Sequence, residues 1–238
     1  MIMLHIGLTG GIASGKSTVV TMLREFGAGI VDCDVIAHDV VLPGTKGLEA
    51  VAAAFGPKAL CEDGSMDRAY IGSLVFQDKA KKAQLEGLLF PLIHDGIEEE
   101  IRKIEEDKKN PVIFLDMPLL YEIKYNSYVD ETWLVYVDAK TQLQRLMQRN
   151  GYSEPEALAR IHAQLPIDEK RSLAQIVIDN NGSPEATAGT SESRMAGLDG
   201  PHWNVGKSRE KKGKYKRENH HSSTGTLLFG IVFLFMER

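Results

Sequence analysis

The residues with the clearest chemical meaning form a glycine-rich run near the start of the chain. The run is Gly10-Gly11-Ile12-Ala13-Ser14-Gly15-Lys16-Ser17, followed by Thr18, and it fits the pattern G-x-x-x-x-G-K-[ST]. It stands between an apolar segment with strand-like alternation and a segment with helical spacing. Backbone N–H groups of such a turn converge on phosphate oxygens, and the following helix N-terminus adds partial positive charge. We therefore predict a site for the phosphates of ATP or GTP.

The side chains of this loop have separate predicted tasks. We expect Lys16 to neutralise the β- and γ-phosphates, and the Ser17 hydroxyl to ligate Mg²⁺. The other residues predicted to bind the nucleotide are Gly10, Gly11, Ala13, Ser14, Gly15 and Thr18. The run Asn-Lys-x-Asp, which reads guanine in GTPases, does not occur in the sequence. ATP and Mg²⁺ are therefore the expected cofactors.

Two carboxylates follow the second predicted strand, in the run Val31-Asp32-Cys33-Asp34. In an open α/β sheet, ligands bind at the carboxyl ends of the strands, beside the phosphate loop. Asp34 can there accept the proton of an attacking hydroxyl or hold a Mg²⁺-bound water. It can equally be the N-cap of a helix over residues 35–41, because aspartate is a favoured cap. Spacing alone leaves both interpretations open.

Strands and helices alternate along the chain in a way that would position these residues. Strands are expected at residues 3–8, 29–31, 112–115, 133–137 and 176–178. This alternation predicts an α/β fold with a parallel five-stranded sheet covered on both faces. Residues 44–107 instead contain three successive helical stretches, at 48–55, 68–77 and 79–106, the last interrupted at Pro91. We interpret them as a helical insert, and the polar residues 150–172 as a helical lid.

Composition and charge restrict the function classes. Hydrophobic residues make up 43% and charged residues 26%, as in an ordinary soluble globular protein. The two cysteines, Cys33 and Cys61, form no disulfide framework, so a reducing, cytoplasmic location is expected. Residues 201–221 alone carry a charge of +5, which leaves about −10 on the first 200 residues. That balance argues against a nucleic-acid-binding surface on the folded part.

The last part of the chain has a different composition. Residues 188–238 are predicted to be a low-complexity, basic and disordered tail after a folded domain at 1–187, because they lack a sustained apolar period. The tail ends in an apolar run at 227–236, about half of the roughly 20 residues that a membrane-spanning helix needs. Contact of this tail with an anionic membrane is the least favoured of its possible roles.

Several blocks of the sequence resemble the dephospho-coenzyme A kinase family. They are Gly7-Leu8-Thr9-Gly10-Gly11-Ile12, Asp32-Cys33-Asp34 with Ile36-Ala37, Asp63-Gly64 with Asp67-Arg68, Pro118-Leu119-Leu120 with Glu122, and Ile178-Asp179-Asn180-Asn181-Gly182. They occur in the family's order and extend over residues 3 to about 187. The resemblance implies a nucleotide core at 1–43 and 108–187, a coenzyme A-binding insert at about 44–107, and a lid at about 150–172.

The resemblance also implies an activity and roles for single residues. The expected reaction is ATP-dependent phosphorylation of the 3′-hydroxyl of dephospho-coenzyme A, the small-molecule substrate. Asp34 resembles the family's general base, while Lys16 and Arg145 resemble its cationic clamp on the transferring phosphoryl group. A planar guanidinium suits that clamp because it grips phosphate oxygens at two points. For Arg149, one turn further on, a clamp and a solvated helix-face charge remain equally open.

Other residues fit the family's pattern without a settled role. Asp116 ends an apolar strand, where either a Mg²⁺-binding acid or a strand-end cap is possible. Gln164, Pro166 and Lys170 match the usual lid, in which Lys170 either reaches a phosphate or is solvated.

Three features depart from the family's pattern. Ala13 stands where many relatives have glycine, and we expect a negative φ there. Phe90 stands where the family usually has histidine, which removes a polar contact to the substrate, and His94 could replace it only if the helix turned its face. After residue 187, Gly189, Thr190 and Ser191 and the basic tail are expected to replace the family's last helix.

Two alternative functions remain at this point. One is a different small-molecule kinase on the same fold, for nucleosides or nucleoside monophosphates, because fold alone does not select a substrate. The other is a non-catalytic protein that keeps the fold and binds through its tail. The intact set of Lys16, Asp34 and Arg145 argues against the second alternative. Oligomeric state is not readable from the sequence.

Overall fold

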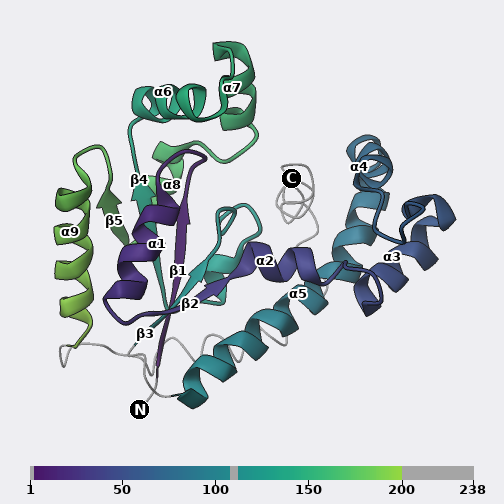
Figure 1. Cartoon of the computed structure of the whole chain (residues 1–238), viewed down its shortest axis with the longest axis horizontal. Helices are drawn as coiled ribbons and strands as arrows, with labels where there is room; N and C mark the ends of the chain where they lie inside the picture. Colours follow the sequence, from purple (N-terminus) through teal and green to yellow (C-terminus); the bar gives the residue numbers. More distant parts are fainter. Residues whose placement is uncertain (1–2, 108–111, 200–238) are drawn as a thin grey trace.

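Five strands form one parallel sheet in the order β2-β3-β1-β4-β5 (Figure 1). The computed structural model describes residues 3–107 and 112–199. The strands are β1 (Leu4–Gly10), β2 (Gly29–Asp32), β3 (Val112–Asp116), β4 (Glu131–Tyr136) and β5 (Ile176–Asp179). The predicted α/β fold with a five-stranded parallel sheet is therefore confirmed. The glycine-rich loop follows β1, the central strand, so neighbouring strands on both sides end beside it.

Helices cover both faces of the sheet, as the strand residues require. Along β3, Val112 and Phe114 join one core cluster, while Ile113 and Leu115 join the other, because successive side chains of a strand point to opposite faces. Helices α1 (Lys16–Glu25) and α9 (Pro184–Ala196) pack together on the first face. On the second face lie α2 (Cys33–Asp39) and the long helix α5 (Lys79–Asp107), as Figure 1 shows.

The predicted insert at 44–107 contains α3 (Lys46–Phe55), the short 3₁₀ helix η1 (Pro57–Ala59), α4 (Arg68–Gln77) and α5. The expected interruption at Pro91 was wrong, because α5 runs continuously from residue 79 to 107. Proline inside a helix removes a hydrogen bond and costs about 3 kcal/mol. Leu89 and Ile93 on either side of Pro91 are buried in the core, and their packing offsets that cost.

The predicted lid region is helical, with α6 (Ala139–Asn150) leading to α7 (Glu154–His162) and α8 (Ile167–Leu173). Asp138 caps α6 by accepting from the amide of Thr141. Ser153 and Glu156 form a capping box at the start of α7, which fixes where the lid helix begins. Between the two helices Gly151 has a φ of 69°, so the chain reverses at a residue without a Cβ. Two short 3₁₀ segments, η2 (Tyr125–Ser127) and η3 (Gly197–Asp199), complete the elements described.

The end of the described chain differs from the prediction. Helix α9 continues to Ala196, so residues 188–196 are not the disordered start of a tail, and the boundary expected at 187 lies inside a helix. Ser191 is fully buried and Met195 nearly so, and Met195 packs in the core cluster beneath α1. Sequence reasoning missed this helix because it has few apolar residues. The basic run at 201–221 and the apolar run at 227–236 lie outside the described residues.

None of the helices within residues 3–107 and 112–199 combines the length and the apolar content needed to cross a membrane.

Removal of α9 provides a test of its place in the core. We predict that truncation after residue 187 lowers the Tm by roughly 5 °C or more relative to truncation after residue 199, because burial of Met195 contributes about 1.5–3 kcal/mol and Ser191 is lost with it. Thermal unfolding of the two truncated proteins side by side measures the difference. Equal melting temperatures would show that α9 adds nothing to the folded domain.

A buried carboxyl in the insert makes stability depend on pH. Glu86 on α5 is 6% exposed, and its Oε1 has no hydrogen-bond partner. Burial raises the pKa of Glu86 to about 7, although the charge of Lys82 one turn earlier opposes the rise. The folded protein therefore binds this proton more tightly than the unfolded chain does. The stability that protonation provides is complete below the ordinary glutamate pKa and is lost as the pH rises through about 7.

Replacement of Glu86 by glutamine should remove that loss. We predict that Glu86→Gln is more stable than the parent at pH 8, by at most about 3 kcal/mol, and that the advantage disappears at pH 5. Chemical unfolding at both pH values measures the difference, with the exposed Glu62→Gln as the control variant. A pH-independent difference between Glu86→Gln and the parent would contradict this account.

Candidate active site

The phosphate loop joins the carboxyl end of β1 to the start of α1 (Figure 1). Gly15 precedes α1 with a φ of 84°, and no side chain caps this helix. The first N–H groups of an α-helix have no partner within the helix, so they are available to an anion. Ser17 and Thr18 are exposed at the same helix end, and the Ser14 hydroxyl is buried without a hydrogen-bond partner. The loop therefore has the form of a phosphate cradle.

Ala13 has an unexpected backbone conformation. Its φ is 58°, in the left-handed region, so the expectation of a negative φ was wrong. A residue with a Cβ is less stable there than glycine by about 1–2 kcal/mol. The loop therefore holds local strain at Ala13.

Lys16 is paired with Asp116 at the end of β3. Both side chains are largely buried. Burial raises the pKa of Asp116, and the ammonium of Lys16 opposes that rise. Asp32 lies opposite Asp116 in the register of β2 and β3, and its charge also raises the Asp116 pKa. Asp116, whose role the sequence left open, thus lies at Lys16 of the loop, and the carboxylate of Asp32 is beside it.

The structure distinguishes the two interpretations of Asp34. Helix α2 begins at Cys33, and its N-cap is Asp32, whose carboxylate accepts from the amides of Asp34 and Val35 at 3.0 Å each. The N-cap interpretation of Asp34 was therefore wrong. Asp34 is half-buried in the first turn of α2, at the carboxyl end of β2. Its carboxylate is not used to begin the helix.

The buried thiol of Cys33 shows that the charged groups gather in one place. Burial is the main cause that raises its pKa well above the ordinary value. The charges of Asp34, Asp116 and Asp32 raise it further, in that order, and the charge of Lys16 lowers it. All four groups therefore lie within electrostatic range of one buried atom, although they come from four different elements.

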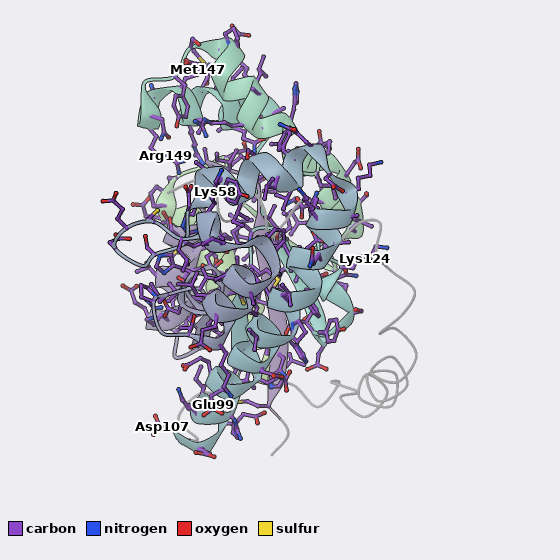
Figure 2. The ribbon with its side chains drawn as sticks, turned by 90° about the vertical axis from the view of Figure 1, so that its right-hand side faces the viewer. Lys58, Glu99, Asp107, Lys124, Met147 and Arg149 are labelled. Atoms are coloured by element: carbon purple, nitrogen blue, oxygen red, sulfur yellow. The ribbon has the colours of Figure 1, made fainter. Side chains whose placement is uncertain are left out.

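Arg145 reaches the loop from α6. A Cβ added to Gly15 would lie 3.9 Å from a terminal nitrogen of Arg145, so the guanidinium adjoins the residue before Lys16. Arg149 does not share this position: it is exposed and donates from Nε to the side chain of Asn150 at 2.8 Å. Figure 2 shows Arg149 near Met147, away from Glu99 and Asp107 at the far end of α5.

Two glutamines hold the loop at Ile12. The amide of Ile12 donates to Oε1 of Gln164 at 2.9 Å, and the Ile12 carbonyl accepts from Nε2 of Gln142 at 2.9 Å. Both glutamine side chains are buried. Gln164 was expected only as part of a lid pattern, and Gln142 was not predicted. A polar residue on the loop-facing side of α6, one turn before Arg145, was the available signal.

Lys170 is not solvated, so that alternative was wrong, while contact with a phosphate stays a prediction. It is fully buried, and its ammonium pairs with Oε1 of Glu122 at 2.8 Å and donates to the carbonyl of Pro118 at 2.8 Å. The same Glu122 oxygen accepts from the amide of Leu165 at 3.0 Å. Burial lowers the Lys170 pKa, and the pairing with Glu122 opposes that shift. This pair joins α8, in the predicted lid region, to the segment that follows β3.

The ion pair of Lys170 and Glu122 predicts how the stabilities of single and double variants compare. Lys170→Met should destabilise the protein by about 3–5 kcal/mol, because it leaves the carboxylate of Glu122 buried without its counter-charge. The double variant Lys170→Met with Glu122→Gln should recover most of that loss, since no unpaired charge remains. Denaturant unfolding of the parent, both single variants and the double variant gives the coupling energy. Purely additive losses would show that the two groups do not act as a pair.

A cluster of aromatic side chains lies where α5 meets the segment after β3. Phe90 and His94 stack in parallel, with ring centroids 6.2 Å apart, so both face the same side of α5. Nδ1 of His94 lies 2.8 Å from the hydroxyl of Tyr125, and the Tyr128 ring lies 5.1 Å from the His94 ring. Phe90 therefore adds an apolar ring to this group, and His94 supplies its imidazole one turn away.

The sheet, the phosphate loop and the charged residues around it define a P-loop kinase. The family model described as dephospho-CoA kinase matches residues 4–185. The chain belongs to the dephospho-CoA kinase family.

Individual relatives agree with this membership. A dephospho-CoA kinase of Carboxydothermus hydrogenoformans is 48% identical over 182 residues, which cover 76% of this chain and 88% of the relative. One of Symbiobacterium thermophilum is 46% identical over 182 residues, covering 76% of each chain. A crystallised Thermus thermophilus protein aligns with a TM-score of 0.73 at 34% identity, over 84% of this chain and all of that one. A dephospho-CoA kinase structure from Campylobacter jejuni gives a TM-score of 0.60 at 27% identity, over 82% and 96%.

Proposed function

We propose that this chain transfers the γ-phosphoryl group of ATP to the 3′-hydroxyl of dephospho-coenzyme A, the last step of coenzyme A formation. Two observations support the proposal: Arg145 adjoins Gly15 of the phosphate loop, and the charges of Lys16 and Asp34 both act on the buried thiol of Cys33. Lys16, Asp34 and Arg145 come from α1, α2 and α6 respectively. Membership of the dephospho-CoA kinase family supports the choice of substrate.

Each of the three side chains has a chemical task in this proposal. Asp34 accepts the proton of the 3′-hydroxyl as that oxygen attacks phosphorus, which is the work of a general base. Lys16 leaves Asp116 and, together with Arg145, balances the negative charge of the transferring group. Asp116 thus keeps the Lys16 ammonium at the loop before ATP binds. Water is displaced from the loop as the phosphates enter.

The donor set suits a magnesium ion that arrives with ATP. Mg²⁺ is usually held by one or two carboxylates together with substrate phosphates and water. The Ser17 hydroxyl is exposed at the start of α1, and the carboxylates of Asp32 and Asp116 end adjacent strands in register. These three residues would hold the ion. When bound, it neutralises phosphate charge and helps to orient the phosphoryl group.

A substrate panel tests the proposal against other small-molecule kinases. ADP formation by the purified full chain is measured with ATP and Mg²⁺ and, one at a time, dephospho-coenzyme A, pantetheine phosphate, adenosine and nucleoside monophosphates. We expect stimulation by dephospho-coenzyme A alone, with coenzyme A as the product. Stimulation by adenosine or a nucleoside monophosphate instead would replace this function with the alternative kinase.

Lys16 is expected to act on turnover rather than on folding. We predict that Lys16→Ala lowers kcat by roughly 10²-fold or more, because the charge it balances develops mainly in the transition state. The measurement is steady-state kinetics with circular dichroism as the check on folding. Lys140→Ala, which removes an exposed lysine of α6, is the matched control. An unchanged kcat in Lys16→Ala would contradict the assignment of the loop.

Asp34 can be tested without disturbing its helix. Since Asp32 is the N-cap of α2, Asp34→Asn removes only a carboxylate of the first turn. We predict a fall in kcat of roughly 10²-fold or more with little change in ATP affinity, the usual scale for a positioned base. Asp39→Asn, at the exposed end of the same helix, is the control. Near-normal turnover in Asp34→Asn would exclude it as the base.

A further inference from the structure

A buried row of polar groups connects the last helix to the phosphate loop. The hydroxyl of Thr187 on α9 donates to Oδ1 of Asn180 at 2.8 Å. Nδ2 of the same Asn180 side chain donates to the carbonyl of Ser14 at 2.7 Å. Thr187 is fully buried and Asn180 is 8% exposed. The row therefore runs through the interior, from α9 to the loop residue before Gly15.

The Ser14 carbonyl and the Thr187 hydroxyl together fix the orientation of the Asn180 amide. An asparagine side chain carries an acceptor oxygen and a donor nitrogen on the same group, and a rotation by half a turn exchanges them. The Ser14 carbonyl can only accept, so it takes the nitrogen, and the Thr187 hydroxyl donates to the oxygen on the other side. The Thr187 hydroxyl also lies 3.3 Å from the Ser183 carbonyl and 3.5 Å from the Asp179 carbonyl. The backbone of Asn180 is fixed separately, because its amide donates to the carbonyl of Tyr136 at 2.8 Å at the end of β4. The side chain thus has one arrangement that satisfies all of its partners.

The Asn180 side chain lies directly against Gly15. A Cβ added to Gly15 would collide with Nδ2 of Asn180, and Arg145 lies 3.9 Å from the same point. Gly15 has a φ of 84° and precedes Lys16, whose amide begins α1. A shift of the Ser14 carbonyl would therefore move the backbone that carries the phosphate-facing amides. It would also change the space that the Arg145 guanidinium adjoins.

We propose that Asn180 and Thr187 are positioning residues for phosphoryl transfer. They act through the Ser14 carbonyl, and neither touches the reacting atoms. Asn180 holds the Ser14–Gly15 peptide in place, and Thr187 supports the amide orientation that makes this contact by donating to the amide oxygen. Helix α9 thereby takes part in the nucleotide site in addition to covering the sheet. The proposal deepens the proposed kinase function and rests on it only for the turnover measurement.

The chain offers a matched pair of hydroxyls for the test. Ser191 lies one turn after Thr187 on α9 and is equally buried, but its hydroxyl donates to the carbonyl of Thr187 within its own helix at 2.8 Å. Thr187→Val keeps the branched shape and removes the hydroxyl, which leaves Oδ1 of Asn180 without this donor. Ser191→Ala removes a hydroxyl with no link to the loop. Thr187→Ser keeps the hydroxyl and is the rescue variant.

Two readouts are measured on the full chain: the Kd of ADP by calorimetry, and kcat/KM for ATP at saturating dephospho-coenzyme A. We expect Thr187→Val to weaken ADP binding and to lower kcat/KM by roughly tenfold, because small displacements at a reacting group are costly. Ser191→Ala should match the parent in both, and Thr187→Ser should remain within about threefold of it. Parent-like values in Thr187→Val, or equal losses in Ser191→Ala, would overturn the proposal.

A second variant keeps the test decisive if Thr187→Val fails to fold. Asn180→Asp preserves the size of the side chain but presents a carboxylate oxygen to the Ser14 carbonyl. We expect weaker ADP binding than in the parent, and ADP binding unaltered in Asn180→Asp would overturn the proposal. ADP affinity does not depend on the acceptor substrate, so the result stands even if dephospho-coenzyme A is not phosphorylated. Failure of the proposed function and failure of this inference are thus separately visible.

Discussion

The phosphate loop imposes one constraint on the rest of the structure: its backbone must face an anion while its own polar groups find partners elsewhere. A loop that turns its N–H groups toward phosphate cannot satisfy them in a sheet or helix. The polar groups of the loop that do not face the phosphate are instead bonded by side chains from distant segments. Gln164 and Gln142 hold the amide and carbonyl of Ile12, Asn180 holds the carbonyl of Ser14, and Asp116 holds the ammonium of Lys16.

The strand order explains how these partners reach the loop. Because β1 is central, with β3 on one side and β4 on the other, the carboxyl ends of its neighbours meet beside the loop. Asp116 ends β3, Arg145 stands on the helix after β4, and Asn180 follows β5. The buried pair of Lys170 and Glu122 then connects α8 to the segment after β3. The carboxyl edge of the sheet thus supplies both the residues of the proposed chemistry and the side chains that hold the loop.

The sequence predicted what local periodicity and motif determine, and it was less successful where tertiary packing decides. The strands and the phosphate loop followed from alternation and a fixed spacing of glycine, lysine and serine. The left-handed conformation of Ala13, the continuity of α5 through Pro91 and the extent of α9 depend on contacts made far along the chain.

The N-cap of α2 shows the same limit of sequence-based prediction. Two aspartates two residues apart fit a cap equally well, and only the position of the first turn assigns the cap to Asp32. Roles for Gln142 and Asn180 could not be read locally, since their partners lie 130 and 166 residues away.

The central claim is that the protein itself builds the phosphate loop, before any nucleotide is present. The most direct measurement is amide hydrogen exchange of Ile12 by nuclear magnetic resonance in the nucleotide-free protein, the ADP complex and the variant Gln164→Leu. The account predicts slow exchange in the nucleotide-free protein, little change with ADP, and fast exchange in the variant, because Gln164 is the acceptor for this amide. Exchange of Ile12 at the rate of an unstructured peptide until ADP is added would contradict it, since the nucleotide would then be ordering the loop.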